Sequence, residues 1–192
     1  MRDDLGMPTG EVHAKAREVL HFWFEELTSK QHFEKDADVD AQIAWRFACL
    51  RTALLSGGAI NWRDDRQALL AAVIVLDQFS RNIYRGQAAS FAADALALAL
   101  ARRAIARGWD RELPPDRRHF LYMPLMHSED IADQQESVRR FEALDNPDAA
   151  QFARDHRDVI ARFGRFPTRN AALGRESSEA ERAYLSRPDA GW

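Results

Sequence analysis

The sequence predicts an all-α fold: seven or eight helices with short connections, packed as antiparallel neighbours in a single domain over residues 1–192. Apolar residues recur every three or four positions along most of the chain, and no stretch shows the pattern of a strand. Capping residues and glycines separate the apolar stretches. The 192 residues, 46% of them hydrophobic, suit one domain with a substantial core. Successive helix pairs are compatible with a tetratricopeptide-like array of helical hairpins, preceded by a flexible N-terminus at residues 1–10.

The first three helices are predicted from their apolar faces. Six positions share one face of the first helix: Val12, Ala16, Val19, Leu20, Trp23 and Leu27. Five do so in the second: Val39, Ile43, Phe47, Leu50 and Leu54. The second helix should stop at Ser56-Gly57-Gly58, because glycine readily closes a helix. The third opens near Asp64 and runs to about Ile83; since it is apolar on all sides over residues 68–76, we expect it to be the central buried helix.

The remaining helices are predicted from their ends. A fourth covers about residues 90–107 and stops at Gly108. A fifth opens at Pro114-Pro115-Asp116, and Pro124 must kink or end it because proline lacks the backbone N–H. Capping residues open the last three, at Ser128, at Asp148 and at a capping box of Ser178 with Glu181. The helix that opens at Asp148 should end before Gly164.

Large side chains on these helices are expected to face the core. Aromatic residues dominate buried area, so Trp23, Trp45 and Trp62 are assigned to it. His156 shares a predicted helix face with Phe152, Ile160 and Phe163, and should therefore point inward.

Composition excludes several classes of partner. The net charge of −3 gives no basic excess, so neither nucleic acid nor a membrane surface is expected as a partner. The lone Cys49 excludes an intramolecular disulfide, and the chain shows neither a signal peptide nor an apolar run long enough to span a bilayer. We expect a cytoplasmic protein, and the sequence leaves its oligomeric state open.

One polar motif occurs twice in apolar surroundings. The first copy is Asp77-Gln78-Phe79-Ser80-Arg81-Asn82-Ile83-Tyr84-Arg85-Gly86, and the second is Arg162-Phe163-Gly164-Arg165-Phe166-Pro167-Thr168-Arg169-Asn170, followed by Gly174-Arg175. In both, a Phe precedes Arg-Asn, and a Gly adjoins a further Arg. A buried guanidinium needs a carboxylate, a carbonyl or a bound anion for its five donors. If the two copies meet, they form either a polar lock or an anion site.

Candidate site residues come from this motif and from three further positions. Asp77, Arg81 and Arg85 are spaced to share a helix face, with the acid in the favourable order. His127 and Glu129 lie at a helix junction, where free backbone N–H groups can bind anions, and His156 faces inward. The candidate ligand-binding residues are Arg81, Asn82, Arg85, Arg165, Arg169 and Asn170. The catalytic candidates are His127, Glu129, His156 and Asp77.

Three functions remain open. The preferred hypothesis is a binding protein whose arginines hold a small anion or a peptide carboxylate. The alternative is a hydrolase or transferase acting on an anionic substrate, with His127 or His156 as general base. The third is a structural or interaction module whose motifs are buried polar locks. No cofactor and no metal are predicted: Glu18-Val19-Leu20-His21 is the only Glu-x-x-His, and no His-Glu-x-x-His, Gly-x-Ser-x-Gly or P-loop occurs.

Four ordered segments resemble a bacterial family, domain-of-unknown-function family 924. They are Val19-Leu20-His21-Phe22-Trp23-Phe24, Leu76-Asp77-Gln78-Phe79-Ser80-Arg81-Asn82, Phe120-Leu121-Tyr122-Met123-Pro124-Leu125-Met126-His127-Ser128-Glu129, and the second motif copy through Leu173-Gly174-Arg175. The resemblance covers nearly the whole chain. It implies an all-helical fold similar to tetratricopeptide-type hairpins, and it leaves the function open.

The chain departs from this family's pattern at three places. Ser80 stands where Pro is common, Thr168 where His is common, and His32-Phe33 where Trp-Phe is common. Chemistry that uses a side chain at position 168 is therefore not expected here.

Overall fold

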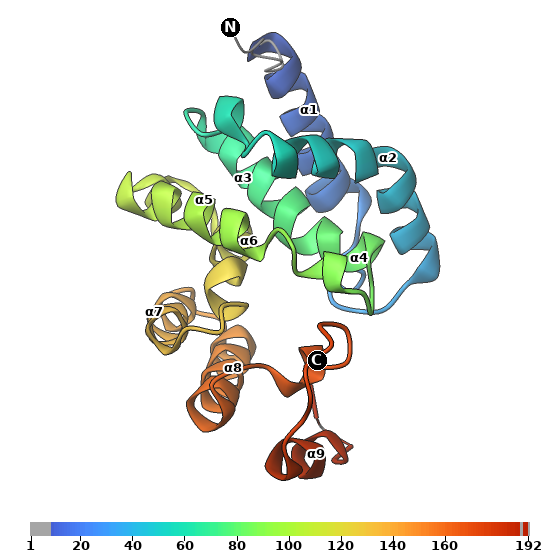
Figure 1. Ribbon diagram of the computed structural model, residues 1–192. Helices are drawn as coiled ribbons and strands as arrows, with labels where there is room; N and C mark the ends of the chain where they lie inside the picture. The colour runs from blue at the N-terminus through green and yellow to red at the C-terminus, as the bar shows by residue number, and fades with distance from the viewer. Residues whose placement is uncertain (1–8, 189, 192) are drawn as a thin grey trace, which may run out of the picture. The chain divides into compact units, whose positions relative to one another are not determined.

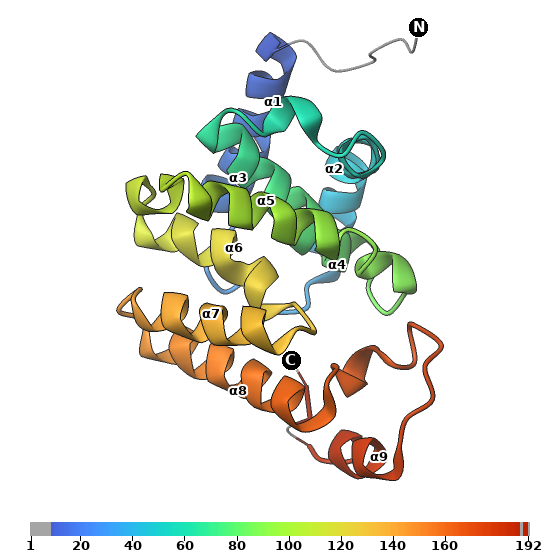
Figure 2. The same ribbon diagram turned by 60° about the vertical axis from the view of Figure 1, so that its left-hand side comes forward.

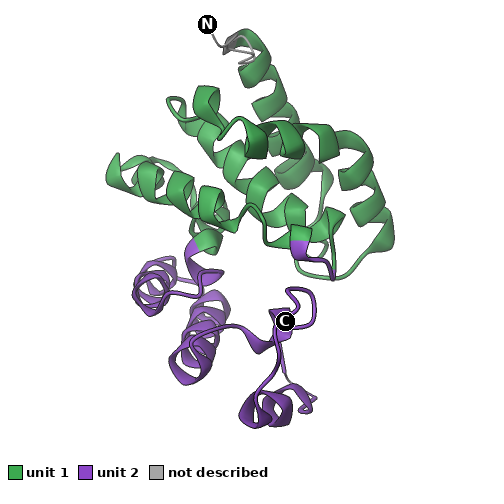
Figure 3. Cartoon of the chain, viewed as in Figure 1, with its two compact units in different colours: residues 1–85, 89–124 green, residues 86–88, 125–192 purple. Residues whose placement is uncertain are grey.

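The computed structural model describes residues 9–188 and 190–191, and no strand occurs among them (Figure 1). This confirms the all-α prediction. The chain divides into two compact units, unit 1 with residues 1–85 and 89–124 and unit 2 with residues 86–88 and 125–192 (Figure 3). The tetratricopeptide-like array and the single domain stay predictions. Of the predicted flexible segment, residues 1–8 lie outside the described part, while Thr9 and Gly10 already belong to the first helix.

Unit 1 is built around one buried helix. Its helices are α1 (Thr9–His21), α2 (Ala37–Ser56), α3 (Arg66–Ile74), α4 (Ser80–Ile83), α5 (Asp94–Ala106) and most of α6 (Pro115–Met126). Every residue from Ala68 to Leu76 is fully buried, and α3 packs against both α1 and α5 (Figure 1). The predicted central helix is thus confirmed, and its apolar circumference is explained by neighbours on opposite sides.

A π-helical turn, Val75–Phe79, joins α3 to α4, so the predicted third helix does continue to Ile83. A π-turn inserts one residue into the helical register and changes which side chains share a face. Arg81 still reaches Asp77, but α4 ends at Ile83, so Arg85 lies beyond the helix and binds Asp40 of α2. The expected common face of Asp77, Arg81 and Arg85 is therefore wrong for Arg85.

The aromatic residues follow the predicted core with one large exception. Trp23 and Trp62 are buried, but Trp45 is 88% exposed. Ile43 and Phe47 of α2 are buried. Trp45 lies two residues from each of them, and two residues correspond to more than half a helical turn. The assignment of Trp45 to the core is therefore wrong: α2 buries one face only, and Trp45 lies on the other.

Unit 2 contains the end of α6, then α7 (Ile131–Glu142), α8 (Pro147–Phe163), a 3-10 turn (Pro167–Arg169) and α9 (Glu179–Leu185). Helices α7 and α8 lie side by side (Figure 2). Helix α8 ends at Gly164, whose φ of 69° is the left-handed conformation that glycine adopts without strain. The glycine stop predicted there is confirmed.

The starts of α7 and α8 in unit 2 lie about half a helical turn from the predicted positions. Asp130, and not Ser128, caps α7, because Ser128 Oγ donates to Asp133 instead. Asn146 caps α8, which places Asp148 in its first turn. The capping box that opens α9 is confirmed.

The other helix ends are close to prediction. Helix α6 passes through Pro124 and ends two residues later, at Met126. Helix α2 ends at Ser56, directly before Gly57, and α5 ends at Ala106, two residues before the predicted Gly108. Helix α5 opens at Asp94, because a 3-10 turn, Ala88–Ser90, occupies the predicted start of the fourth helix.

Ser80 supports a buried arginine, and its removal gives a testable prediction. Arg51 donates from Nε to Ser80 Oγ at 3.0 Å and from Nη2 to the Ala89 carbonyl at 2.8 Å. In Ser80→Ala the buried Nε–H loses its acceptor, so we expect the free energy of unfolding to fall by about 1–2 kcal/mol in urea denaturation. Ser56→Ala, at the exposed end of α2, is the control and should change it by less than about 0.5 kcal/mol. Equal effects of the two variants would contradict this role.

Candidate functional site

The first copy of the motif forms a charged network inside unit 1. Arg81 donates to Asp94 with two parallel bonds, Nη1 to Oδ1 at 3.0 Å and Nη2 to Oδ2 at 3.1 Å. Its Nη1 also reaches the Asp77 carbonyl at 2.9 Å and the Asp77 carboxylate at 3.2 Å. Burial alone would lower the pKa of Arg81, but Asp77 and Asp94 raise it above its ordinary value. Asp77 is fully buried in the π-turn, where Gln78 Nε2 donates to its carboxylate.

The next residues of that copy tie α4 to α2. Arg85 donates from Nε to Asp40 Oδ2 at 2.9 Å and from Nη2 to Oδ1 at 2.7 Å, and Asn82 Nδ2 donates to the same carboxylate at 2.7 Å. Partial burial would raise the pKa of Asp40, but these hydrogen bonds outweigh it and hold the pKa below its ordinary value. Arg81, Asn82 and Arg85 therefore all act as donors within unit 1.

The second copy is organised by Glu129. Arg175 donates to both of its carboxylate oxygens, at 2.8 and 3.0 Å, and the Phe166 N–H donates at 2.8 Å. Burial alone would raise the pKa of Glu129, whereas these bonds lower it. Glu129 thus connects the α6–α7 junction to the segment after α8.

The remaining polar residues of that segment hold the turn in place. Arg165 donates to Glu181 at 2.6 and 2.8 Å, and the hydrogen bonds from Arg165 and from the Ser178 N–H lower the pKa of Glu181 strongly. The buried Asn170 accepts from Arg175 Nε at 3.0 Å and donates to Ser177 Oγ at 3.0 Å. The chain between Arg165 and Glu181 is therefore fixed by side chains and not by regular structure.

Two histidines lie beside this turn. The ring centroids of His127 and His156 are 6.3 Å apart, and that of Phe166 is 5.6 Å from His156. Arg169 donates to the His127 carbonyl at 2.8 Å, and its guanidinium carbon lies 4.6 Å from the centre of the Phe166 ring. His156 Nδ1 lies 2.7 Å from the Phe152 carbonyl, which can only accept, so Nδ1 carries a proton and Nε2 is the basic nitrogen.

The structure places the predicted residues in two groups. Unit 2 holds His127, Glu129, His156, Arg165, Arg169 and Asn170, while unit 1 holds Asp77, Arg81, Asn82 and Arg85. His156 is buried, as its helix face predicts, although Phe152 of the same predicted face is 51% exposed. The meeting of the two motif copies stays a prediction.

Sequence reasoning missed several acidic partners. Asp40 and Asp94 lie 45 and 13 residues from the arginines they bind. Nothing local to either acid signals that pairing. Glu181 could have been found only as a capping-box residue, because its carboxylate serves both the Ser178 N–H and Arg165. The sequence places Arg175 beside the second motif copy but does not identify it as the partner of Glu129.

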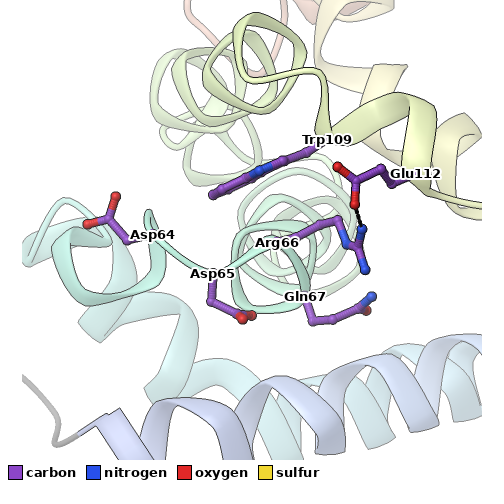
Figure 4. Close-up of a pocket in the computed structure, with 6 residues that line it drawn as sticks. All are labelled: Asp64, Asp65, Arg66, Gln67, Trp109 and Glu112. Carbon is purple, nitrogen blue, oxygen red and sulfur yellow. Dashed lines mark hydrogen bonds and ion pairs between the residues drawn. The ribbon is translucent and has the colours of Figure 1, made fainter.

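A shallow depression of about 330 Å³ lies in unit 1 at the start of α3 (Figure 4). It is lined by Asp64, Asp65, Arg66, Gln67, Trp109 and Glu112. Asp65 caps α3, Arg66 bonds to Glu112, and Asp64 accepts from Arg103 at 2.7 Å. These charged side chains have structural partners, and the depression contains none of the predicted site residues.

Within the described ranges, no three His, Cys, Asp or Glu side chains are placed to hold a metal ion. No helix in that part of the chain is long and apolar enough to cross a membrane.

Acid should destabilise these networks, which gives a second prediction. The pKa values of Asp40, Glu129 and Glu181 are lower in the folded chain than their ordinary values. The folded state therefore binds fewer protons than the unfolded state around pH 4, so the contribution of these carboxylates is fully present above about pH 5 and is lost as the pH falls through the folded pKa values. We expect the unfolding midpoint in urea to decline below about pH 4.5. A midpoint that rises on acidification through this range would contradict the assignment.

Comparison with known proteins gives a family. The model of a family of bacterial proteins of unknown function, DUF924, matches residues 19–189. A solved structure, that of the protein of unknown function ATU0120 from Agrobacterium tumefaciens, is 38% identical, covers 91% of this chain and 98% of its own, and superimposes with a TM-score of 0.86. No curated protein matches. The resemblance drawn from the four sequence segments is thus confirmed, and the chain belongs to the DUF924 family.

Proposed function

We propose that the protein binds a small anion or a peptide carboxylate at His127, His156 and Arg169 of unit 2. The observation that carries this proposal is the pair of imidazoles, with ring centroids 6.3 Å apart, beside a guanidinium. A guanidinium offers parallel N–H donors to carboxylate or phosphate. An imidazole can add an N–H donor, and in His156, whose Nδ1–H already bonds to the Phe152 carbonyl, that donor is the Nε2–H of the protonated ring.

The other motif residues support this site by position. Glu129 and Arg175 hold the backbone of Phe166, which precedes the turn that carries Arg169. Asn170 extends the same network. Arg81, Arg85 and Arg165 each bind a carboxylate of the chain, so they act as structural locks in this proposal and do not contact the ligand. Of the six candidate ligand-binding residues, only Arg169 therefore contacts the ligand in this proposal, and His127 and His156 contact it as well.

One observation favours an enzyme as the second candidate. The bond from His156 Nδ1 to the Phe152 carbonyl fixes both the ring orientation and the basic nitrogen, as a general base requires. In that case the bound anion is a substrate of a hydrolase or transferase. Turnover of an anionic ester or anhydride that is lost in His156→Gln would identify this case.

Calorimetry with phosphate, acetate and a short peptide with a free carboxylate tests the binding proposal. We expect a saturable signal with at least one of them, weakened by about tenfold in His127→Gln, since one lost hydrogen bond to a charged ligand costs about 1.5 kcal/mol. His21→Gln, an exposed histidine of unit 1, is the matched control. Absence of a signal with all three anions, or equal weakening in both variants, would overturn the proposal.

A further inference from the structure

The backbone around His127 is held by two side chains. Helix α6 ends at Met126, so His127 is the first residue of the connection to α7. Gln134 Nε2 donates to the Met126 carbonyl at 2.7 Å and to the Ser128 carbonyl at 2.6 Å. Arg169 donates to the carbonyl between these two, that of His127, at 2.8 Å. Three successive carbonyls therefore each accept a hydrogen bond from a side chain.

The amide of Gln134 is fully committed to this connection. Gln134 belongs to α7, where its own N–H bonds to the Asp130 carbonyl at 3.1 Å, and its side chain is fully buried. A primary amide has two N–H donors, and Gln134 uses its Nε2 on the two carbonyls. Rotation of the amide would break both bonds in a place that water does not reach. The amide therefore holds the two carbonyls at a fixed separation.

These bonds fix the direction of the His127 side chain. Peptide groups are planar, so the orientation of the groups around a residue sets the direction of its Cα–Cβ bond. The carbonyls of Met126 and His127 belong to the two peptide groups that flank His127, and the Ser128 carbonyl belongs to the next one. With all three held, the imidazole leaves the backbone in one direction, and its ring centroid lies 6.3 Å from that of His156.

Capping of α6 does not by itself account for this arrangement. The last carbonyls of a helix lack a partner within the helix, and the bond from Gln134 to the Met126 carbonyl supplies one. The second bond goes to Ser128, which lies outside the helix. The Gln134 Oε1 atom is also buried without a hydrogen-bond partner in the described part of the chain, and such an atom costs free energy. Gln134 therefore contributes less to stability than its two bonds suggest, and its clearest effect is on the connection that carries His127.

From the two bridged carbonyls, the burial of the amide and the ring placement that results, we infer that Gln134 is the positioning residue of His127. It acts through the backbone and does not contact the ligand. Its consequence for binding rests on the anion site proposed above, whereas its effect on the His127 ring exists without any ligand. A ring that is held in place before binding loses little conformational freedom when the anion arrives, so the anion is bound more tightly.

Crystal structures without added anion test the positioning directly. Gln134→Met keeps the length of the side chain but removes both donors, so the His127 ring should leave its position 6.3 Å from His156 or lose its order. Ser137→Ala is the matched control, because Ser137 is also fully buried on α7 and its Oγ has no hydrogen-bond partner within the described residues. This variant should leave the ring in place. A His127 ring that keeps its position in Gln134→Met would overturn the inference.

Calorimetry with phosphate and with acetate tests the consequence for binding. We expect Gln134→Met to bind about tenfold more weakly than the wild type, the effect of one lost hydrogen bond to a charged ligand, and Ser137→Ala to bind like the wild type. Equal affinities of the wild type and a folded Gln134→Met would overturn the inference, even if the variant is less stable.

Two further outcomes are separated by design. If Gln134→Met does not fold, Gln134→Asn takes its place in both experiments, because it keeps the amide but is one methylene shorter and should not reach both carbonyls. A wild-type chain that binds neither anion would overturn the proposed function instead, and the position of the His127 ring in the anion-free crystal structures would then decide the inference.

Discussion

Arg81→Ala is expected to lower the free energy of unfolding by about 3–5 kcal/mol, the range found when one partner of a buried ion pair is removed. The substitution removes the guanidinium that lies 3.2 Å from the fully buried Asp77 carboxylate and that binds Asp94 through two bonds. Burial of a carboxylate without its cation is costly, because the charge has lost its hydration. Urea denaturation followed by circular dichroism measures the change.

Two further variants separate this role from a general loss of charge. Arg81→Lys keeps the charge but cannot form the two parallel bonds to Asp94, so its free energy of unfolding should lie between those of the wild type and Arg81→Ala. Arg111→Ala, an exposed arginine of unit 1, should change the stability by less than about 0.5 kcal/mol. If Arg81→Ala were as mild as Arg111→Ala, the first motif copy would not be a lock.

Glu129→Ala is expected to lower the free energy of unfolding by about 2–3 kcal/mol, because the carboxylate accepts charge-assisted bonds from Arg175 and a backbone bond from Phe166. Glu129→Gln keeps an acceptor, so its free energy of unfolding should fall by less. In the double variant Glu129→Ala/Arg175→Ala the free energy of unfolding should fall by less than the sum of the two single decreases, since the two residues form one pair.

Hydrogen exchange shows whether the effect of Glu129→Ala is confined to its contact with Phe166. In the wild type the Phe166 N–H bonds to Glu129 at 2.8 Å, so its exchange should accelerate in Glu129→Ala. The Gly164 N–H, which bonds to the Ile160 carbonyl at the end of α8, serves as an internal reference. Equal acceleration of both amides would show global destabilisation and not the loss of one bond.

Much of the fold could be predicted because its determinants are local. The apolar residues 68–76 indicate a helix buried on all sides, and Gly164 indicates where α8 ends. Ser178 and Glu181 indicate the start of α9 by a capping box that needs only four residues of sequence. Each of these signals depends on helix geometry alone.

The rest could not be predicted because it depends on tertiary contacts. The sequence of the π-turn at Val75–Phe79 is ordinary for a helix, and α4 ends at Ile83, so Arg85 does not continue the helix face of Arg81. Asp94 and Asp40 find their arginines only after the helices have packed. The size of Trp45 predicts a core position, whereas the period of the buried residues around it, Ile43 and Phe47, places it on the outward face. For Trp45 the spacing was the better guide.

Histidine-selective NMR of the wild-type chain, which records the ring nitrogens during titration with phosphate and acetate, tests the proposed anion site most directly. We predict the Nδ1-protonated form for neutral His156 and saturable shifts of His127 and His156, while His13 and His21 in α1 stay unchanged relative to a matched chloride titration. Signals of His127 and His156 that do not move, or that move in step with those of His13 and His21, would contradict an anion site in unit 2.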